Sequence, residues 1–372
     1  MKKSALFLCL FFALLSYQNG WAQLETSYPS AAVLYKVLSD DPAMQNRFWL
    51  HIQPITADAM AMNAAVGSGL ETHWITPFRG LELHGGIRGT FFNAMDLQKR
   101  AAAGSAVFLQ ETKYDDPSRN VLEKDFNRFL AWEAGAFYPF LEKKTNGKAN
   151  IAVPDQSGVA ENLELNAKVL RSLGARLGIN GLQSTVSLNQ ALEDQNIELT
   201  GNNGTRLSPK GSSVVSGSPY TSPEGRNSLF TSFSSTGLYA GIAMQRRKNI
   251  SIKTETMGIV SSNSILTFYA DLLFNPWTEL KDFTITQSSG GSAETFGTGK
   301  IGLSKSGFRA GFEVRYNERN FMSAGAEIGY RPAIQGQGFY AALRLGIPVF
   351  SVGKNAFSKP ATNVGADQSI GK

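Results

Sequence analysis

Along most of this chain, apolar residues alternate with polar or glycine residues, which is the two-residue period of a β-strand. One run places Arg309, Gly311 and Glu313 between apolar neighbours that share the opposite face: Phe308, Ala310, Phe312, Val314 and Tyr316. Runs with the same period occur at 81–87, 130–138, 266–274, 322–330 and 339–347. The pattern therefore predicts an all-β protein.

The length and number of the runs indicate a membrane barrel. Strands of about ten residues with one apolar face, separated by turns, are typical of transmembrane β-barrels. Lipid cannot form hydrogen bonds with the backbone, so every backbone group must pair within the sheet and the sheet must close into a ring. Twelve runs can be assigned: 47–57, 60–76, 81–92, 128–141, 162–180, 228–246, 249–260, 264–275, 280–287, 299–316, 320–331 and 338–350. The prediction is a closed antiparallel transmembrane β-barrel of about 12 strands, with 10 or 14 as alternatives because the first and ninth runs are weak. A soluble β-sandwich, the competing interpretation, would have shorter runs and more polar outer faces.

The links between runs predict the orientation, since short turns are periplasmic and long loops extracellular in such barrels. Short links fall at Thr76–Gly80, Glu142–Lys148, Arg246–Asn249, Asn275–Lys281 and Asn317–Asn320. Long links fall at Asn93–Asn127, Gly181–Asn227 and Gln287–Thr298. The segment Asn162–Ile179 fits either a helix or a strand, and its glycines Gly174 and Gly178 favour the strand.

The N-terminus has the features of a cleaved signal peptide: Lys2 and Lys3, an apolar run to Leu15, and small residues before Gln23. The expected divisions are a signal peptide over 1–22, a periplasmic segment over 23–46, the barrel over 47–350, and a flexible tail over 351–372. A short helix is expected at Ser30–Ser39. The single cysteine, Cys9, lies in the leader, so disulfides and thiolate metal sites are excluded from the mature chain.

Composition adds little about function. The formal net charge is +6, or +4 without Lys2 and Lys3, and it is not gathered into a basic block. A nucleic-acid partner is therefore not expected.

The chain at this point resembles the broad class of outer-membrane β-barrel proteins with long surface loops. The resemblance rests on the strand pattern over nearly all of the mature chain and implies the fold and an outer-membrane location. It also implies contact with outer-membrane lipids and with the barrel-assembly machinery. One departure is the C-terminus, where a polar tail follows Phe350 in place of a terminal phenylalanine.

Alternation also predicts which charged residues face the lumen. The main lumen-lining residues are Arg88, Glu133, Arg309, Glu313, Arg315, Glu327 and Arg344. With Lys168, Arg176, Arg331, Glu71, Glu82 and Asp271 they make seven positive and six negative inward positions, which favours ion pairing over ion selectivity. The leading functional hypothesis is a conduit for small or lipid-like solutes. The alternative is a structural or interaction subunit of an envelope assembly that binds a protein partner through its loops.

A candidate metal site lies in the hairpin around Pro77. Pairing of Thr76 with Leu81 would place His73 opposite His84, close enough for the two imidazoles to share a divalent cation with Glu71 or Glu82. The alternative is an ordinary polar lumen wall. No cofactor is expected.

Enzyme motifs are weak. Gly297, Gly299 and Gly302 match a dinucleotide-binding pattern in letters, but the following residues alternate as a strand, so a glycine-rich loop is the better interpretation. The G-x-S-x-G pattern of a nucleophile elbow is absent from the sequence. The chain is therefore expected not to be an enzyme.

Overall fold

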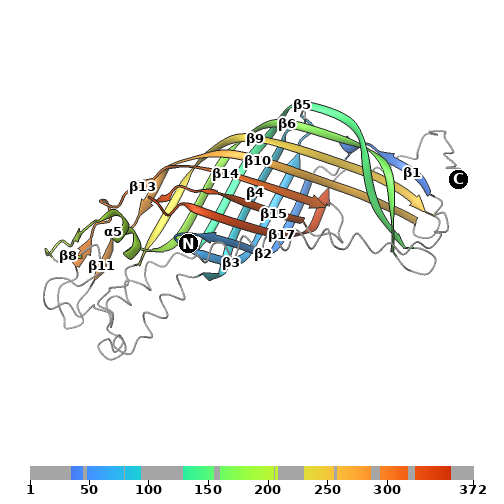
Figure 1. Ribbon diagram of the computed structural model, residues 1–372. Helices are drawn as coiled ribbons and strands as arrows, with labels where there is room; N and C mark the ends of the chain where they lie inside the picture. Colours follow the sequence, from blue (N-terminus) through green and yellow to red (C-terminus); the bar gives the residue numbers. More distant parts are fainter. Residues whose placement is uncertain are drawn as a thin grey trace.

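The computed structural model describes residues 35–44, 48–78, 80–93, 129–154, 160–204, 206–207, 230–254, 258–285, 294–316 and 323–352. One sheet has eleven strands in the order β1-β9-β10-β14-β15-β17-β2-β3-β4-β5-β6, and β6 also pairs with β9. This last pairing closes ten strands into an antiparallel barrel, seen from the side in Figure 1, and leaves β1 attached to β9. The fold class predicted from sequence is confirmed, with ten strands rather than 12.

The strands of the ring differ greatly in length. The bounds are β2 (Phe48–Met60), β3 (Ala64–Ile75), β4 (Glu82–Asn93), β5 (Leu130–Pro154), β6 (Ala160–Ser187), β9 (Phe230–Thr254), β10 (Gly258–Leu280), β14 (Ser306–Tyr316), β15 (Ser323–Tyr330) and β17 (Phe339–Val352). We call β14, β15, β17, β2, β3 and β4, with 8 to 14 residues each, the short side. The strands β5, β6, β9 and β10, with 23 to 28 residues each, form the long side.

Alternation along the strands separates an apolar outer face from a charged inner face. Ile328 is 60% exposed, whereas its neighbour Glu327 is 2% exposed; Phe308 is 51% exposed beside Arg309 at 4%. An apolar groove of about 520 Å³ runs over the outer face between Leu177 and Leu272. Apolar side chains covering the outside of a closed sheet are what lipid requires.

The long side continues past the ring at the end that holds the short turns. This extension comprises 35–41, 143–154, 160–171, 248–254 and 258–263 (Figure 1). Its two parts, the β5–β6 hairpin and the β1–β9–β10 sheet, enclose a separate small core of Ala149, Ile151, Leu165, Ala167, Ile250 and Ile252.

The N-terminal helix predicted at Ser30–Ser39 is wrong over its described part, because Tyr35–Asp40 forms strand β1. The cause is an open edge. The β6–β9 pairing ends at Val169 and Lys248, and β1 pairs with the next residues of β9, from Ile250 to Thr254. The Asp40 carboxylate also accepts a hydrogen bond of 2.7 Å from the backbone N–H of Lys168 on β6. Backbone pairing at an exposed strand edge thus overrides the helical spacing of the sequence.

Links at the other end of the barrel fold into a lid. It contains α5 (Asn189–Gln195) and short strands: β7 (Leu199–Thr200), β8 (Arg206–Leu207), β11 (Phe283–Ile285), β12 (Glu294–Phe296), β13 (Leu303–Ser304) and β16 (Ala333–Ile334). Leu188, Ala191 and Leu192 are fully buried in one apolar cluster that includes Met60, Phe233, Phe296 and Ile334. The lid therefore rests on the mouth of the barrel through its own hydrophobic core.

The strand count was too high because polar stretches of long strands resemble turns. Glu142–Lys148 and Arg246–Asn249, predicted as turns, lie inside β5 and β9, and Asn275–Lys281 falls mostly within β10. The run 280–287 contains β11 of the lid. In contrast, Asn162–Ile179 is confirmed as strand, within β6. Links 94–128 and 317–322, the predicted signal peptide and the C-terminal tail beyond 352 lie outside the described residues.

Two smaller expectations can also be compared with the fold. The glycines Gly297, Gly299 and Gly302 lie in the link between β12 and β13, as the loop interpretation predicted. Among the described residues, no helix is long and apolar enough to cross a membrane.

Candidate functional site

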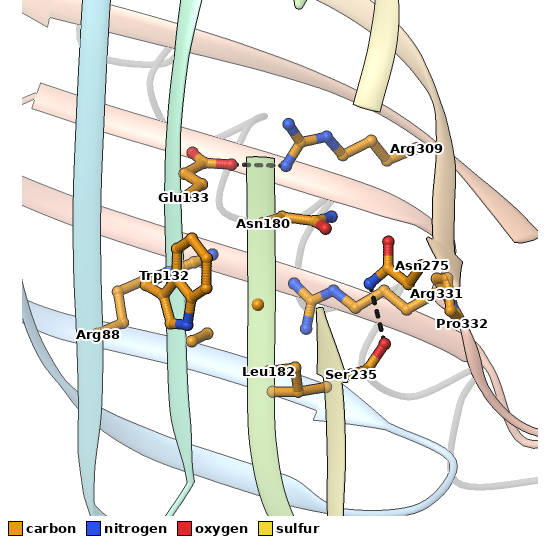
Figure 2. Close-up of a pocket in the computed structure, with 12 residues that line it drawn as sticks. Arg88, Trp132, Glu133, Asn180, Leu182, Ser235, Asn275, Arg309, Arg331 and Pro332 are labelled. Atoms are coloured by element: carbon orange, nitrogen blue, oxygen red, sulfur yellow. Dashed lines mark hydrogen bonds and ion pairs between the residues drawn. The ribbon is translucent and has the colours of Figure 1, made fainter. Parts of the chain in front are cut away.

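Charged side chains from both sides of the barrel meet inside the ring, where the inward positions of the strands converge. Arg309 of β14 is the centre of the group nearer the lid. Its guanidinium lies 2.8 Å from Asp271 of β10, 2.7 Å from Glu133 of β5 and 3.4 Å from Glu327 of β15. Figure 2 shows Glu133 and Arg309 pointing toward each other from different strands. One arginine thus connects three carboxylates on separate strands.

Tyrosines and further arginines complete this group. Tyr269 donates a hydrogen bond of 2.6 Å to one oxygen of Glu327, and Tyr340 donates to the other oxygen. Arg344 donates to the hydroxyl of Tyr269 at 3.0 Å. Arg331, paired with Asp58 at 2.6 Å, lies over the Tyr340 ring at 3.6 Å from its centroid. The pairing explains how so many charges are buried, since an unpaired charge inside a protein is strongly unfavourable.

A second group lies nearer the short turns and is centred on Glu82 of β4. One carboxylate oxygen accepts from Arg315 at 2.7 Å and faces Nδ1 of His73 at 2.9 Å. The other oxygen accepts from Gln245 at 2.9 Å and from Arg247 at 3.4 Å. Glu82 is 2% exposed, and its partners come from β3, β9 and β14. The carboxylate therefore links the short side to the long side a second time.

Glycines on the wall make room for the aromatic side chains of the network. A Cβ placed on Gly135 would lie 2.0 Å from the hydroxyl of Tyr239, and one on Gly178 would lie 2.5 Å from it. The Tyr239 ring can therefore lie against the backbone of β5 and β6. Arg309 then stacks on this ring at 4.5 Å from its centroid, which adds a cation–π contact to the ion pairs.

The side chains leave little free volume inside the ring. One cavity of about 30 Å³ lies beside Arg88, Glu133 and Arg309 (Figure 2), and another of about 20 Å³ lies beside His73, Glu82 and Arg315. Each has room for about one water molecule. The described inward side chains thus occupy most of the lumen at the level of the two charged groups.

The structure places all seven predicted lumen-lining residues on the inner face: Arg88, Glu133, Arg309, Glu313, Arg315, Glu327 and Arg344. Arg176 and Asp271 are also inward and pair at 3.4 Å. Lys168, predicted inward, is an exception, because it lies in the extension and is exposed.

The predicted histidine pair has the proposed register but a different set of contacts. Thr76 donates its N–H to Leu81, and His73 is directly opposite His84, with ring centroids 6.1 Å apart. Nε2 of His84 is bonded to the Tyr239 hydroxyl at 2.6 Å, whereas His73 lies between Glu71 and Glu82. The metal site formed by His73, His84, Glu71 and Glu82 stays a prediction.

Sequence analysis did not identify several members of the network. Arg247 was predicted within a turn, and Tyr239 and Tyr269 were not predicted to line the lumen. Their inward parity is visible in the sequence, but the lumen prediction used charged residues alone. The signal that could have identified them is the matching of each tyrosine with a glycine on a neighbouring strand.

Comparisons with known proteins give only general similarity. No family model matches the sequence, and no curated protein matches it. A toluene transporter, TodX of P. putida, is 10% identical, with 84% of this chain and 91% of that chain covered and a TM-score of 0.23. The transport unit of the autotransporter AIDA-I from Escherichia coli is 9% identical, with 82% and 90% covered and a TM-score of 0.21. OmpT, an outer membrane protein of Vibrio cholerae, is 8% identical, with 86% and 100% covered and a TM-score of 0.16. This likeness extends to the β-barrel fold alone.

The prediction that the chain is not an enzyme is wrong, because an enzyme is possible for this chain. Three structures of OmpT from Vibrio cholerae are among the similar proteins, beside a transporter and an autotransporter unit. A β-barrel fold by itself does not exclude an enzyme, so the exclusion does not hold. The exclusion rested on the missing nucleophile elbow and the unsuitable dinucleotide-binding pattern, and it did not consider a buried histidine with carboxylates at both ring nitrogens.

Proposed function

We propose that this protein is an outer-membrane β-barrel whose lumen is closed and which serves as an interaction subunit of an envelope assembly. The observation that carries the proposal is the filled lumen: two linked ion-pair groups lie inside the ring, and an apolar lid covers one mouth. A conduit for small or lipid-like solutes, the other hypothesis from sequence, would need these buried pairs to separate. Ten strands are also closer to eight-stranded barrels, whose interior is filled by side chains, than to 16-stranded porins.

The apolar outer face supports membrane insertion and implies outer-membrane lipids as its surroundings. Short turns such as Thr76–Gly80 would face the periplasm and the lid would face outward, following the usual orientation of such barrels. Both ends of the ring, Phe48 of β2 and Val352 of β17, pair with each other at the end with the short turns. In this orientation the extension projects into the periplasm, and insertion would use the barrel-assembly machinery.

The extension supplies a surface for a partner. Among its described side chains, the exposed basic ones are Lys36, Lys143, Lys144, Lys148, Lys168, Arg171 and Lys253. Glu164 is the exposed acidic one, while Asp40 and Asp41 are half-buried. A surface with this excess of positive charge favours an acidic partner, because complementary potentials raise the rate and specificity of association.

Conductance in planar bilayers tests the closed lumen. The refolded full-length protein, with its folding checked by heat-modifiable mobility on gels, should give no steady channels. Steady channels of the folded protein would favour the conduit and would overturn the proposal.

Charge reversal tests the partner surface. The double variant Lys143→Glu and Lys253→Glu should abolish salt-sensitive co-purification of a defined envelope protein. Lys300→Glu, an exposed lysine outside the extension, is the matched control and should leave that interaction unchanged. Equal binding by both variants would show that the extension is not the docking surface.

A further inference from the structure

We infer that the lumen holds a binding site for one divalent transition-metal cation, formed by Glu71 and His73 of β3 and Glu313 of β14. Nε2 of His73 lies 3.1 Å from Oε1 of Glu71 and 3.6 Å from Oε1 of Glu313. One ligand atom from each residue lies within 4.8 Å of the other two. Ligands at zinc-like bond lengths in a tetrahedron are about 3.4 Å apart, so these three atoms are spaced as three corners of such a site.

Two of the ligand atoms are buried without a hydrogen bond in the described structure, although one of them, Oε1 of Glu313, lies in an ion pair with Arg315. Nε2 of His73 and Oε1 of Glu313 are buried and make no hydrogen bond among the described residues. His73 is 3% exposed. Buried polar atoms are nearly always bonded to something, so atoms that converge on one point without a hydrogen bond indicate a missing partner.

The surrounding residues hold the ligands as the outer residues of metal sites usually do. The Nδ1 of His73 faces Oε1 of Glu82 at 2.9 Å, which fixes Nε2 as the free nitrogen. The second oxygen of Glu71 accepts a hydrogen bond of 2.6 Å from Gln53. A metal-bound histidine that donates its other N–H to a carboxylate, and a ligating carboxylate with its own donor, are the common arrangement.

The cavity supplies a fourth position. The space of about 20 Å³ beside Glu71, His73 and Glu313 has room for one water ligand. Three protein ligands and one water are the ligand number of catalytic zinc sites. The donor set of one imidazole and two carboxylates suits Zn²⁺ or Mn²⁺ better than thiolate-preferring ions.

This site differs from the one predicted from sequence, in which His84 was a ligand. His84 is bonded to Tyr239 instead, and Glu313, brought in from β14, takes its place. Two cations compete with the ion: Nε of Arg315 lies 3.0 Å from Oε1 of Glu313, and Arg344 lies 3.9 Å from Oε1 of Glu71. The same arrangement of side chains could instead hold a protonated His73 between the carboxylates, with no metal ion bound.

Zinc titration of the full-length protein, refolded in detergent and freed of metal by a chelator, tests the inference. Calorimetry should give one Zn²⁺ bound per chain. Glu313→Gln and Glu71→Gln should each weaken binding by at least about 10–100-fold, the loss usual when a residue that only hydrogen-bonds a metal ligand is changed. His84→Gln, which changes a neighbouring histidine outside the site, is the matched control and should bind zinc within about threefold of the parent.

Each variant is compared only when its heat-modifiable mobility shows a folded barrel. Stoichiometric zinc in the parent, weakened by either carboxamide substitution, would establish the site. Absence of zinc binding in the folded parent, or equal binding by Glu313→Gln, Glu71→Gln and the parent, would overturn it and leave a protonated His73 between its carboxylates. The parent alone decides the matter if both variants fail to fold.

Discussion

The short side and the long side of the barrel have the same inner face but different surroundings. On the short side, strands of 8 to 14 residues are close to the roughly 9–11 residues that span a bilayer. On the long side, strands of 23 to 28 residues continue into the extension, where a second core replaces lipid as the apolar environment. Lipid therefore sets the strand length only where the strand has no other apolar partner.

The largest expected effect concerns the residue that joins the two sides. Arg309→Ala would leave Glu133, Asp271 and Glu327 without their shared cation, so the free energy of unfolding should fall by about 3–5 kcal/mol. Urea unfolding of the refolded barrel measures this. Arg206→Ala is the control, because its ion pair with Glu198 in the lid is 65% exposed at the arginine and should cost less than about 1 kcal/mol. Equal losses of unfolding free energy in the two variants would show that the ion-pair network does not hold the short side and the long side together.

An intermediate effect should locate the boundary between lipid and extension. Ile242 of β9 and Ile259 of β10 are similarly exposed, at 58% and 50%, but only Ile242 lies in the ring. Arginine at the bilayer midplane costs about 2–4 kcal/mol and near zero outside it. Ile242→Arg should therefore impair folding into lipid vesicles, and Ile259→Arg should fold as the parent does. Similar impairment by both would place the extension in the membrane.

The smallest effect concerns the attachment of β1 to the long side. Lys144 of β5 pairs with Asp41 at 3.3 Å, and the two side chains are 57% and 37% exposed. Lys144→Ala should lower the free energy of unfolding by less than about 1 kcal/mol, because exposed pairs contribute little. Hydrogen exchange of the Val37 and Ile252 amides would report on β1 directly. Rapid exchange in the variant would show that the ion pair, rather than backbone pairing with β9, holds β1 in place.

The short side was predictable from sequence because its environment is simple. Between Phe308 and Tyr316 the outward positions are all apolar and the inward charged residues all belong to the network, so parity alone gives the fold. The long side was not, because the polar residues Glu142–Lys148 belong to strands outside lipid and look like a turn. The site was partly predictable for the same reason: His73 and Glu71 follow from one hairpin, whereas Glu313 comes from a strand that only ring closure brings near.

The position of β1 has a consequence for the order of assembly. Its residues precede the ring in the chain, yet their partners on β9, from Ile250 to Thr254, are synthesised more than two hundred positions later. Contacts between such distant segments form slowly, since a long loop must close first. The edge of β9 therefore stays unpaired until β1 pairs with it. During that interval the extension exposes unpaired backbone N–H and C=O groups. A chaperone that covers this strand edge would prevent it from pairing with another chain.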